Sequence, residues 1–476
     1  MLLFLTIALP MLGGAAMGLM RFSSAKSRGI YVETIVLATS ILTWVLLLTR
    51  TYAFRVDGMS CIFAGLVSIL WPLASLYGFE YMQHEERPNT FFSYYTMSYA
   101  VTLAVAFSAN LFSLYVFYEC LTLITLPLVI HKKDTMSIRA GRKYLTFSIS
   151  GAALAFIALV FIIYYGTTTD FVLGGVLDAE KISGMEELLK FVFLLAFVGF
   201  GTKAAVFPMY AWLPAASVAP TPVTALLHAV AVVNAGAYAV LRVIYYSFGA
   251  SFLYGTWAQT VALLLSCFTI LFGSTMAVRE QHFKRRLAYS TISNLSYMLM
   301  GAALMTPDGM TGSLSHLVIH GVIKITLFYC AGAILIKTGK EYVQDLRGYS
   351  RIMPATCGIF LLGSIALVGT PPLAGFVSKW NLLTAASATE LPMGTVAIVC
   401  LIVSAILTAI YLFTAALPMY FRPLNADQAQ LAGQKLDPSW MMLLPMGILC
   451  ALMIGLGLWS QPLVTFLRNI AAGVIF

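Results

Sequence analysis

The fold is decided by the stretch Gly201-Thr-Lys203-Ala-Ala-Val-Phe-Pro208-Met-Tyr-Ala-Trp-Leu-Pro214-Ala-Ala-Ser-Val-Ala-Pro220-Thr-Pro222. It is nearly all apolar, yet it carries one lysine and four prolines within 15 residues. Because proline lacks an N–H and clashes with the preceding turn, these four cannot sit in one continuous helix. A membrane tolerates such a break only where protein or a water-filled cavity satisfies the freed backbone groups. The stretch therefore predicts a broken transmembrane helix beside a polar interior.

The composition of the rest of the chain supports a membrane location. Of the 476 residues, 60% are hydrophobic and only 10% are charged, against roughly 25% charged in soluble proteins. The apolar residues form runs of about 18–22, long enough to cross a bilayer core of roughly 30 Å. The first run, residues 1–20, has no basic leader and predicts a retained span rather than a signal peptide. The sequence thus predicts an all-α polytopic membrane protein.

Apolar runs and polar breaks predict about 14 transmembrane helices. The predicted spans are 1–20, 30–49, 59–79, 91–108, 111–130, 144–165, 188–212, 221–245, 255–277, 287–305, 312–336, 354–384, 392–418 and 439–460. Residues 461–476 are expected to form a further surface helix.

The basic residues predict how the chain lies in the membrane. Of 28 Lys and Arg, 19 fall in odd-numbered loops, with Lys133 and Lys284 among them, and 6 fall on the opposite side, with Arg242 among them. Since cytoplasmic loops are enriched in Lys and Arg, the odd loops should be cytoplasmic and both termini outside, in the cell (inner) membrane. The acidic 166–187 segment, with Glu186, should face outward. The net charge of +9 then requires no nucleic-acid partner.

A few ionisable residues lie inside the predicted spans and away from their ends, unlike Glu33, which lies close to the end of its span. They are Glu119, Lys203, His228, His316, His320, Lys324 and Lys379. A charge at mid-bilayer costs at least about 2.5–3.5 kcal/mol on insertion scales, and such residues usually line ion or proton pathways. The alternative for each is a structural ion pair or a side chain that reaches the membrane surface. Three lysines and a carboxylate in separate spans favour a proton pathway.

Glu119 and Lys203 are the expected pair of opposite charges. Glu119 lies in Leu111-Phe-Ser-Leu-Tyr-Val-Phe-Tyr-Glu119-Cys-Leu-Thr-Leu, among aromatic and apolar neighbours, and needs a cation or a proton. Two charges about 4 Å apart interact by about 4 kcal/mol at an effective dielectric near 20. Moving the carboxylate by a few ångströms would therefore change the proton affinity of the lysine, so the pair can load and unload a proton.

The span 312–336 carries a row of bases. His316, His320 and Lys324 fall at i, i+4 and i+8 and so share one helix face, about 6 Å apart along the axis. This spacing suits proton hopping through single waters. Zinc binding by the two histidines is the rival interpretation, although no Asp or Cys in this segment completes a coordination shell. His228 either joins the relay or hydrogen-bonds a neighbouring helix.

A second proline break accompanies Lys379, in Gly369-Thr-Pro371-Pro372-Leu-Ala-Gly375-Phe-Val-Ser-Lys379. Proline interruptions beside an intramembrane lysine in both halves favour a repeated unit, as in transport folds built from inverted repeats. Pro371 and Pro372 should thus have the role of Pro208, Pro214, Pro220 and Pro222 in the first half.

No cofactor, metal or catalytic site is expected in the chain. The seven cysteines fall in or beside apolar runs, and no two form a CxxC. There is also no GxGxxG, and no pair of histidines on two helices suited to haem. A redox enzyme subunit is therefore disfavoured, and a structural scaffold would not explain the buried charges.

Together these segments resemble the proton-conducting antiporter-like subunits. That family is shared by respiratory complex I (the NADH dehydrogenase type), Mrp-type multisubunit sodium/proton antiporters and membrane-bound, energy-converting hydrogenases. The resemblance covers the chain from Asp57 to about Tyr420. It is carried by Phe117-Tyr-Glu119, by the segment from Trp212 to His228, by Lys284-Arg-Arg-Leu-Ala-Tyr-Ser-Thr-Ile-Ser-Asn-Leu-Ser-Tyr297, by His320-Gly-Val-Ile-Lys324 and by Pro371-Pro-Leu-Ala-Gly-Phe-Val-Ser-Lys379.

The resemblance implies 14 transmembrane helices with two inverted five-helix repeats and broken helices 7 and 12. The chain then divides into N-terminal spans 1–90, a first repeat 91–245, a second repeat 255–420 and a C-terminal span with its tail, 439–476. It also implies that Glu119 pairs with Lys203, that the His316–Lys324 group is central and that Lys379 leads to the outer side. Implied partners are other membrane subunits, including further antiporter-like subunits, and a peripheral redox arm.

Some positions depart from the commoner complex I pattern. Tyr118 replaces a usual Trp, Ala215 stands where Asp is frequent, His282 takes the place of an Asp, and Asn234 stands where some relatives carry Lys. These changes favour the Mrp or hydrogenase branch. The leading function is proton translocation within a larger membrane complex. A Na⁺/H⁺ exchange module is the alternative, although Na⁺ prefers oxygen ligands and the central row is rich in His and Lys.

Overall fold

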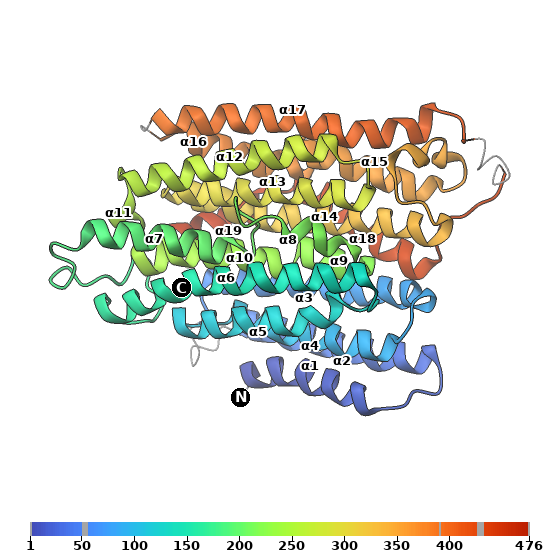
Figure 1. Cartoon of the computed structure of the whole chain (residues 1–476), viewed down its shortest axis with the longest axis horizontal. Helices are drawn as coiled ribbons and strands as arrows, with labels where there is room; N and C mark the ends of the chain where they lie inside the picture. Colours follow the sequence, from blue (N-terminus) through green and yellow to red (C-terminus); the bar gives the residue numbers. More distant parts are fainter. Residues whose placement is uncertain (1, 50–55, 390–391, 426–432, 475–476) are drawn as a thin grey trace.

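The computed structural model describes residues 2–49, 56–389, 392–425 and 433–474, and these form a bundle of nearly parallel helices (Figure 1). The long helices are α1 (Leu2–Leu19), α2 (Ala25–Thr49), α3 (Gly58–Tyr81), α4 (Pro88–Ala106), α5 (Leu111–Val129), α6 (Thr135–Tyr165), α7 (Glu186–Gly201), α12 (Trp257–Arg279), α13 (Phe283–Ala303), α14 (Pro307–Thr338), α15 (Pro354–Val368), α16 (Ala374–Ser387), α17 (Pro392–Phe421) and α18 (Trp440–Leu458). The shorter ones are α8 (Trp212–Ala215), α9 (Thr221–Ala229), α10 (Val232–Arg242), α11 (Ala250–Leu253) and α19 (Gln461–Ala471).

The described residues contain no β-strand, only three isolated bridges. Ten stretches of helix in the described part are long and apolar enough to cross a membrane. The prediction of an all-helical, multi-pass protein is therefore confirmed. We call the two ends of the bundle the Asp57 end, where α3 begins, and the Lys132 end, where α5 is followed by α6.

Two helices begin at a capping side chain, before the apolar run that predicted them. Asp134 accepts a hydrogen bond from the Ser137 N–H, so α6 begins at Thr135 instead of the predicted 144. Thr306 caps α14 in the same way by accepting a hydrogen bond from the Gly309 N–H. The helix α14 therefore begins at Pro307, five residues before the predicted start at 312. Side-chain oxygens at these positions satisfy N–H groups that have no partner inside the helix.

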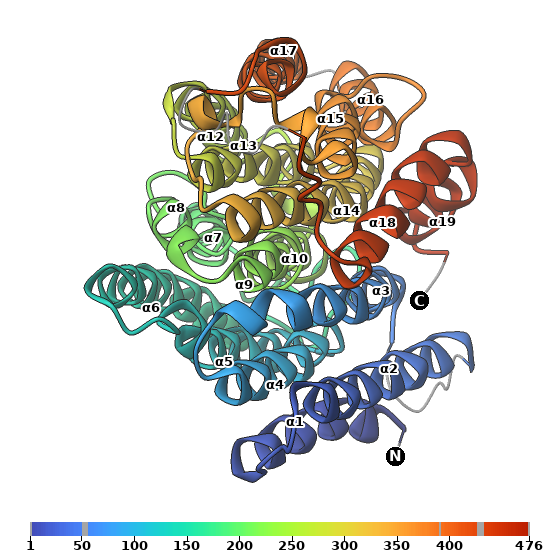
Figure 2. The same cartoon turned by 90° about the vertical axis from the view of Figure 1, so that its right-hand side faces the viewer.

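The helix α14 lies near the centre of the bundle, as a view along the helices shows, with α1 and α2 at one edge and α17 at the other (Figure 2). It packs on α3, α9, α13, α15, α16, α18 and α19. Its 32 residues span about 48 Å at about 1.5 Å per residue. The residues of α9 and α10 are buried without exception, whereas α1 and α17 expose many apolar side chains. The predicted charged residues of α14 thus lie at the centre of the molecule.

The long segments are interrupted in three places. The helix α7 ends at Gly201, and the chain turns past Pro208 before α8 and α9 begin. The helices α15 and α16 are separated by residues 369–373, which include Pro371 and Pro372. A third break, at Val230–Ala231 between α9 and α10, contains no proline and was not predicted.

Three of the basic residues that the charge count assigned to loops are instead buried, among them Arg286, which is 3% exposed and donates to the carbonyl of Glu280 at 2.8 Å. Arg242 is 1% exposed and forms an ion pair with Asp57, which joins α10 to the start of α3. Lys284, in the first turn of α13, is 6% exposed, so the expectation that it lies at the surface was wrong. Each has polar partners that the sequence could not reveal: a carboxylate for Arg242, and the carbonyl of Ala219 for Lys284.

The tail, by contrast, forms the helix α19 as expected, but it is not only a surface helix. It packs on α14 and α3, and Leu467 and Ile470 are buried.

The crossing of α15 and α16 leaves no room for a side chain at Gly375. A Cβ added there would lie 1.7 Å from the carbonyl oxygen of Ala366. We expect Gly375→Ala to destabilise the protein by about 1–3 kcal/mol, because backbone must move apart. Gly447→Ala on α18 is the matched control, since no other atom lies within 4 Å of its added Cβ. Thermal unfolding in detergent measures both, and an unchanged Tm for Gly375→Ala would contradict the close crossing.

Candidate proton pathway

The structure brings Glu119 and Lys203 together. The Lys203 Nζ lies 3.7 Å from Glu119 Oε1, and their side chains are 1% and 24% exposed. Glu119 projects from the middle of α5, and Lys203 follows directly after the end of α7. The Glu119 Oε1 atom is buried and accepts no hydrogen bond from any described residue. The carboxylate is therefore held near the ammonium without being fixed by other donors.

The surroundings of Lys203 are built by the break after α7. Its ammonium donates to the carbonyl of Tyr118 and lies 3.4 Å from the centroid of the Tyr118 ring. The Tyr118 hydroxyl donates to the carbonyl of Phe200, 2.6 Å away, which ties α5 to the last turn of α7. Trp212 donates to the carbonyl of Thr202 at 2.8 Å, so the broken end keeps its hydrogen bonds. Aromatic and carbonyl groups thus supply the favourable contacts that a buried cation needs.

Small residues let neighbouring helices approach this break. A Cβ added at Gly236 of α10 would lie 2.4 Å from the backbone nitrogen of Ala204, next to Lys203. A Cβ added at Gly151 of α6 would lie 2.5 Å from Thr202 Oγ1. Close packing through small residues is a common way for membrane helices to associate. It fixes the backbone on both sides of the lysine.

The second group of predicted residues lies on α14 and α16. The ring centroids of His316 and His320 are 5.8 Å apart, close to the predicted spacing. His316 Nδ1 lies 2.9 Å from the Ser378 hydroxyl of α16. The other ring nitrogen of His316 and both ring nitrogens of His320 are buried without a hydrogen-bond partner among the described residues. These imidazoles therefore have unused donor and acceptor capacity inside the protein.

The ammonium groups of Lys324 and Lys379 donate hydrogen bonds to backbone carbonyls, and that of Lys324 also donates to a hydroxyl. The Lys324 ammonium donates to the carbonyl of Leu287 at 3.1 Å and to the Ser290 hydroxyl at 2.5 Å. Lys379 donates to the carbonyls of Leu367 and Val368, at 2.8 and 3.0 Å. These two carbonyls end α15, where the helix dipole favours a cation. The end of α15 at this break thus provides the carbonyls that bind the Lys379 ammonium.

His228 of α9 lies against α14, on the side of the second group. It is 0% exposed, its ring centroid is 4.9 Å from that of Phe328 on α14, and neither ring nitrogen has a partner among the described residues. It is close enough to Lys324 and Lys284 for electrostatic interaction. Among the described residues, no neighbouring helix forms a hydrogen bond with its ring. The part of the chain that the structure describes contains no hydrogen bond or ion pair between His228 and Lys203.

Sequence reasoning missed Lys284, which donates to the carbonyl of Ala219 at 3.1 Å. A cluster of surface charges surrounds it at the Lys132 end. Lys132 lies 3.3 Å from Glu85, and His282 lies 3.6 Å from Glu341. The nearby His282 ring lowers the pKa of Glu341. Burial lowers the pKa of Lys132, and the nearby Glu85 carboxylate raises it. The net effect is a raised pKa.

Residues that could hold a metal ion do not gather in the described part of the chain. No group of three His, Cys, Asp or Glu side chains has a suitable arrangement there. In particular, no third ligand of this kind accompanies His316 and His320. The zinc interpretation of the two histidines therefore finds no support in the geometry.

Comparison with known proteins identifies relatives of this arrangement. Residues 108–408 match the family described as "NADH:quinone oxidoreductase/Mrp antiporter, TM". NADH-quinone oxidoreductase subunit N of Desulforudis audaxviator is 30% identical over 414 residues, which cover 84% of this chain and 80% of the relative. A Na(+)/H(+) antiporter subunit of Alkalihalophilus pseudofirmus is 32% identical over 403 residues, 80% of this chain. The match covers 49% of that antiporter protein, so the chain spans about half the length of this relative.

Solved structures share the fold. A chain from the membrane-bound sulfane sulfur reductase, an archaeal respiratory membrane complex, superposes with a TM-score of 0.84 at 20% identity and covers 99% of this chain and 97% of its own length. A chain of the Mrp complex from Dietzia sp. DQ12-45-1b gives the same TM-score and identity, covering 99% and 96%. The family match includes all five segments that carry the resemblance. The chain therefore belongs to the NADH:quinone oxidoreductase/Mrp antiporter transmembrane family.

Proposed function

We propose that the chain is a proton-translocating, antiporter-like subunit of a multisubunit membrane complex, in which redox or ion-gradient energy moves protons through Glu119, Lys203, His228, His320, His316, Lys324 and Lys379. The observation that carries the proposal is the Glu119–Lys203 pair, 3.7 Å apart, in the same molecule as His316 and His320, which keep three buried ring nitrogens without a hydrogen-bond partner among the described residues. Ionisable groups this deep in a membrane protein usually mark a proton or ion path. The chain has no active site of its own in this proposal.

The proposed architecture has 14 membrane crossings and two inverted five-helix repeats, over residues 91–245 and 255–420, flanked by 1–90 and 439–476. Two similar devices support it. The helix α7 ends in a break followed by Lys203, and α15 ends in a break followed by Lys379. In each, the broken backbone lies next to a lysine that donates to main-chain carbonyls.

In this proposal the Glu119–Lys203 pair acts as the switch. When the carboxylate stays near, it stabilises the charged lysine, and when it moves away, the lysine can release its proton toward His228. The row on α14 then carries the proton to Lys379. Lys284 is a buried base close to Lys132, Glu341 and Glu85 at the Lys132 end, so it would supply protons to His228.

Exchange of Na⁺ for protons is the second candidate, supported by the similarity to a Na(+)/H(+) antiporter protein. Sodium prefers oxygen ligands, whereas the α14 row offers nitrogen atoms of His316, His320 and Lys324. The chemistry of this row therefore favours protons as the ion that passes through it. Sodium ions could still be handled elsewhere in the same complex.

The proposed setting is a cell (inner) membrane, with the Lys132 end in the cytoplasm and both chain termini outside. The excess of Lys and Arg in the loops at the Lys132 end supports this orientation. The proposed partners are other membrane subunits, including further antiporter-like subunits, and a peripheral redox arm of the hydrogenase or NADH dehydrogenase type. The oxidoreductase and antiporter relatives are, by their names, parts of larger assemblies, which supports partners of this kind.

Glu119→Gln and Lys203→Met should each lower proton uptake by more than about tenfold while the complex stays assembled. A pair at this distance interacts by about 4 kcal/mol at an effective dielectric near 20, and about 1.4 kcal/mol corresponds to tenfold. Uptake is measured in inverted vesicles that contain the whole complex, with and without Na⁺.

Glu33→Gln is the matched control for this switch. Glu33 of α2 is another carboxylate inside a span. It accepts a hydrogen bond from the Ser75 hydroxyl instead of pairing with a lysine. Its variant should keep normal uptake. Normal uptake in either switch variant would refute the switch, and strict dependence of wild-type uptake on Na⁺ would favour the exchange function.

Lys379→Arg should assemble normally yet block uptake, because guanidinium keeps its proton at a pKa above about 12. The arginine can still donate to the carbonyls that end α15, so the structural contact is preserved. His316→Gln removes one of several relay groups, which water can replace, and should only slow uptake. Near-normal uptake in Lys379→Arg would mean that Lys379 is a structural charge and that protons leave elsewhere.

Orientation can be tested with single cysteines at Lys133 and Glu187 in a background without the native cysteines. Lys133 is exposed, and the side chain of Glu187 is 72% exposed. An impermeant thiol reagent should label Lys133→Cys from the cytoplasmic side only and Glu187→Cys from the outside only. The reverse pattern would overturn the proposed orientation. Lys284 is unsuitable because it is buried.

A further inference from the structure

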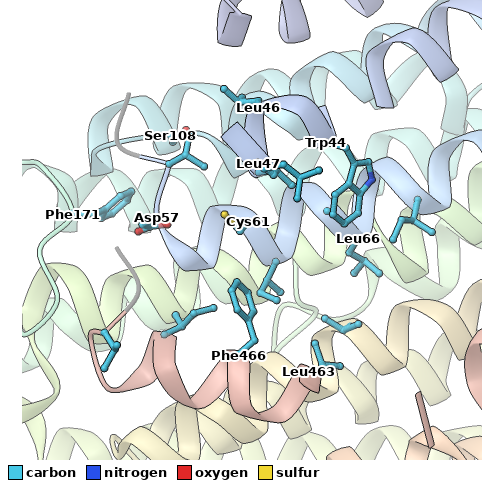
Figure 3. A pocket seen from close by; sticks show the side chains of 18 of the residues that line it. Trp44, Leu46, Leu47, Asp57, Cys61, Leu66, Ser108, Phe171, Leu463 and Phe466 are labelled. Atoms are coloured by element: carbon cyan, nitrogen blue, oxygen red, sulfur yellow. The ribbon is translucent and has the colours of Figure 1, made fainter. Parts of the chain in front are cut away.

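A large cavity lies apart from the proton pathway, on the side of α14 that faces α2 and α19. Its volume is about 1120 Å³, and it is lined by α2, α3, α14, α18 and α19 (Figure 3). Trp44 and Leu47 of α2 lie on one side, Leu463 and Phe466 of α19 lie on the other, and Leu66 of α3 lies between them. These helices, except for α19, are long and apolar enough to cross a membrane. The cavity is therefore within the depth of the bilayer.

The polar groups of the cavity gather at one end. Most of the lining is aliphatic or aromatic, whereas Asp57, Ser108 and Tyr246 lie at the Asp57 end of the bundle. Asp57 accepts a hydrogen bond of 2.6 Å from Arg242, whose guanidinium also lies 4.7 Å from the centroid of the Phe171 ring at the same end. The cavity thus has a long apolar part and one polar mouth, where Asp57 is paired with the buried Arg242. A molecule that fits it must be apolar along most of its length and polar at one end.

The volume of the cavity distinguishes between a transmembrane helix and lipid acyl chains as its occupant. A membrane-spanning helix of 20 residues, about 10 Å wide and about 30 Å long, fills roughly 2,400 Å³ and does not fit. A methylene group takes about the space of a water molecule, roughly 30 Å³, so the cavity holds roughly 37 of them. That is the content of two acyl chains of about 18 carbons each.

We propose that this cavity binds one membrane phospholipid, with its two acyl chains between α2, α3, α14 and α19 and its headgroup at the Asp57 end. The bilayer supplies this molecule at high local concentration, and the chains cover apolar side chains such as Leu66 and Phe466. The chains also contact Val318 and Val322, which lie on the same helix as His316, His320 and Lys324. The lipid thereby excludes water from the side of α14 opposite His316, His320 and Lys324.

Two glycines offer a matched pair of variants for the test. A Cβ added at Gly65 of α3 would make ordinary contacts with Leu47 and Trp44, both 3.8 Å away, so a larger side chain there must extend into the cavity. Gly447 of α18 is exposed, and its added Cβ meets nothing within 4 Å. Gly65→Phe should fill part of the cavity, whereas Gly447→Phe adds the same ring on the outer surface.

The experiment compares the phospholipid retained by the purified complex after extensive detergent washing, using phosphate analysis and mass spectrometry. Wild type and Gly447→Phe should keep one more tightly bound phospholipid per chain than Gly65→Phe. Equal retention in all three, an isoprenoid quinone in place of the phospholipid, or a wild-type complex without it would overturn the proposal.

A second measurement on the wild type does not depend on the folding of any variant. A phospholipid with a photoreactive diazirine at the end of one acyl chain is exchanged into the complex in detergent before irradiation. It should cross-link to α2, α3 or α19 peptides that line the cavity, such as those with Leu47, Leu66 or Phe466. Cross-links confined to the outer surfaces of α1 and α17 would refute the site.

Discussion

A lysine ammonium inside a membrane protein needs acceptors for its hydrogens, and in this chain the backbone supplies them. Lys203, Lys284, Lys324 and Lys379 each donate to at least one main-chain carbonyl. Within a helix most carbonyls already accept an N–H from four residues later, whereas the last carbonyls of a helix lack that partner. Lys379 uses carbonyls that end α15, Lys284 uses a carbonyl just before α9, and Lys203 itself lies in the break after α7. Helix ends therefore supply the acceptors of Lys379 and Lys284, whereas Lys203 and Lys324 donate to carbonyls inside α5 and α13.

This constraint explains why prolines and lysines occur together in the sequence. The Pro371–Pro372 pair follows α15, and the last carbonyls of that helix hold Lys379. The break after α7 positions Lys203 against α5, where Glu119 meets it. The two halves differ in one respect. The first half provides a carboxylate beside its lysine, whereas the described residues of the second half provide only hydroxyls, imidazoles and carbonyls around Lys324 and Lys379.

Much of this arrangement could be predicted from the sequence, because charged residues are rare inside apolar spans and each one can be recognised there. The pairing of Glu119 with Lys203 and the spacing of His316 and His320 follow from span assignment and helical periodicity. The break between α9 and α10 could not be predicted, since it contains no proline and is held by Asn234, which donates to the carbonyl of Ala229. The burial of Arg242 and Lys284 was missed because a charge near the end of an apolar run looks like a loop residue until its tertiary partner is known.

The spacing of the imidazoles on α14 also limits how many protons the helix can carry. Two positive charges 5.8 Å apart repel by about 3 kcal/mol at an effective dielectric near 20, which disfavours the doubly charged form by roughly a hundredfold. No carboxylate on α14 beyond its first turn offsets this repulsion. In the proposed pathway, His316 and His320 would share one extra proton but rarely hold two, so protons would pass along α14 one at a time.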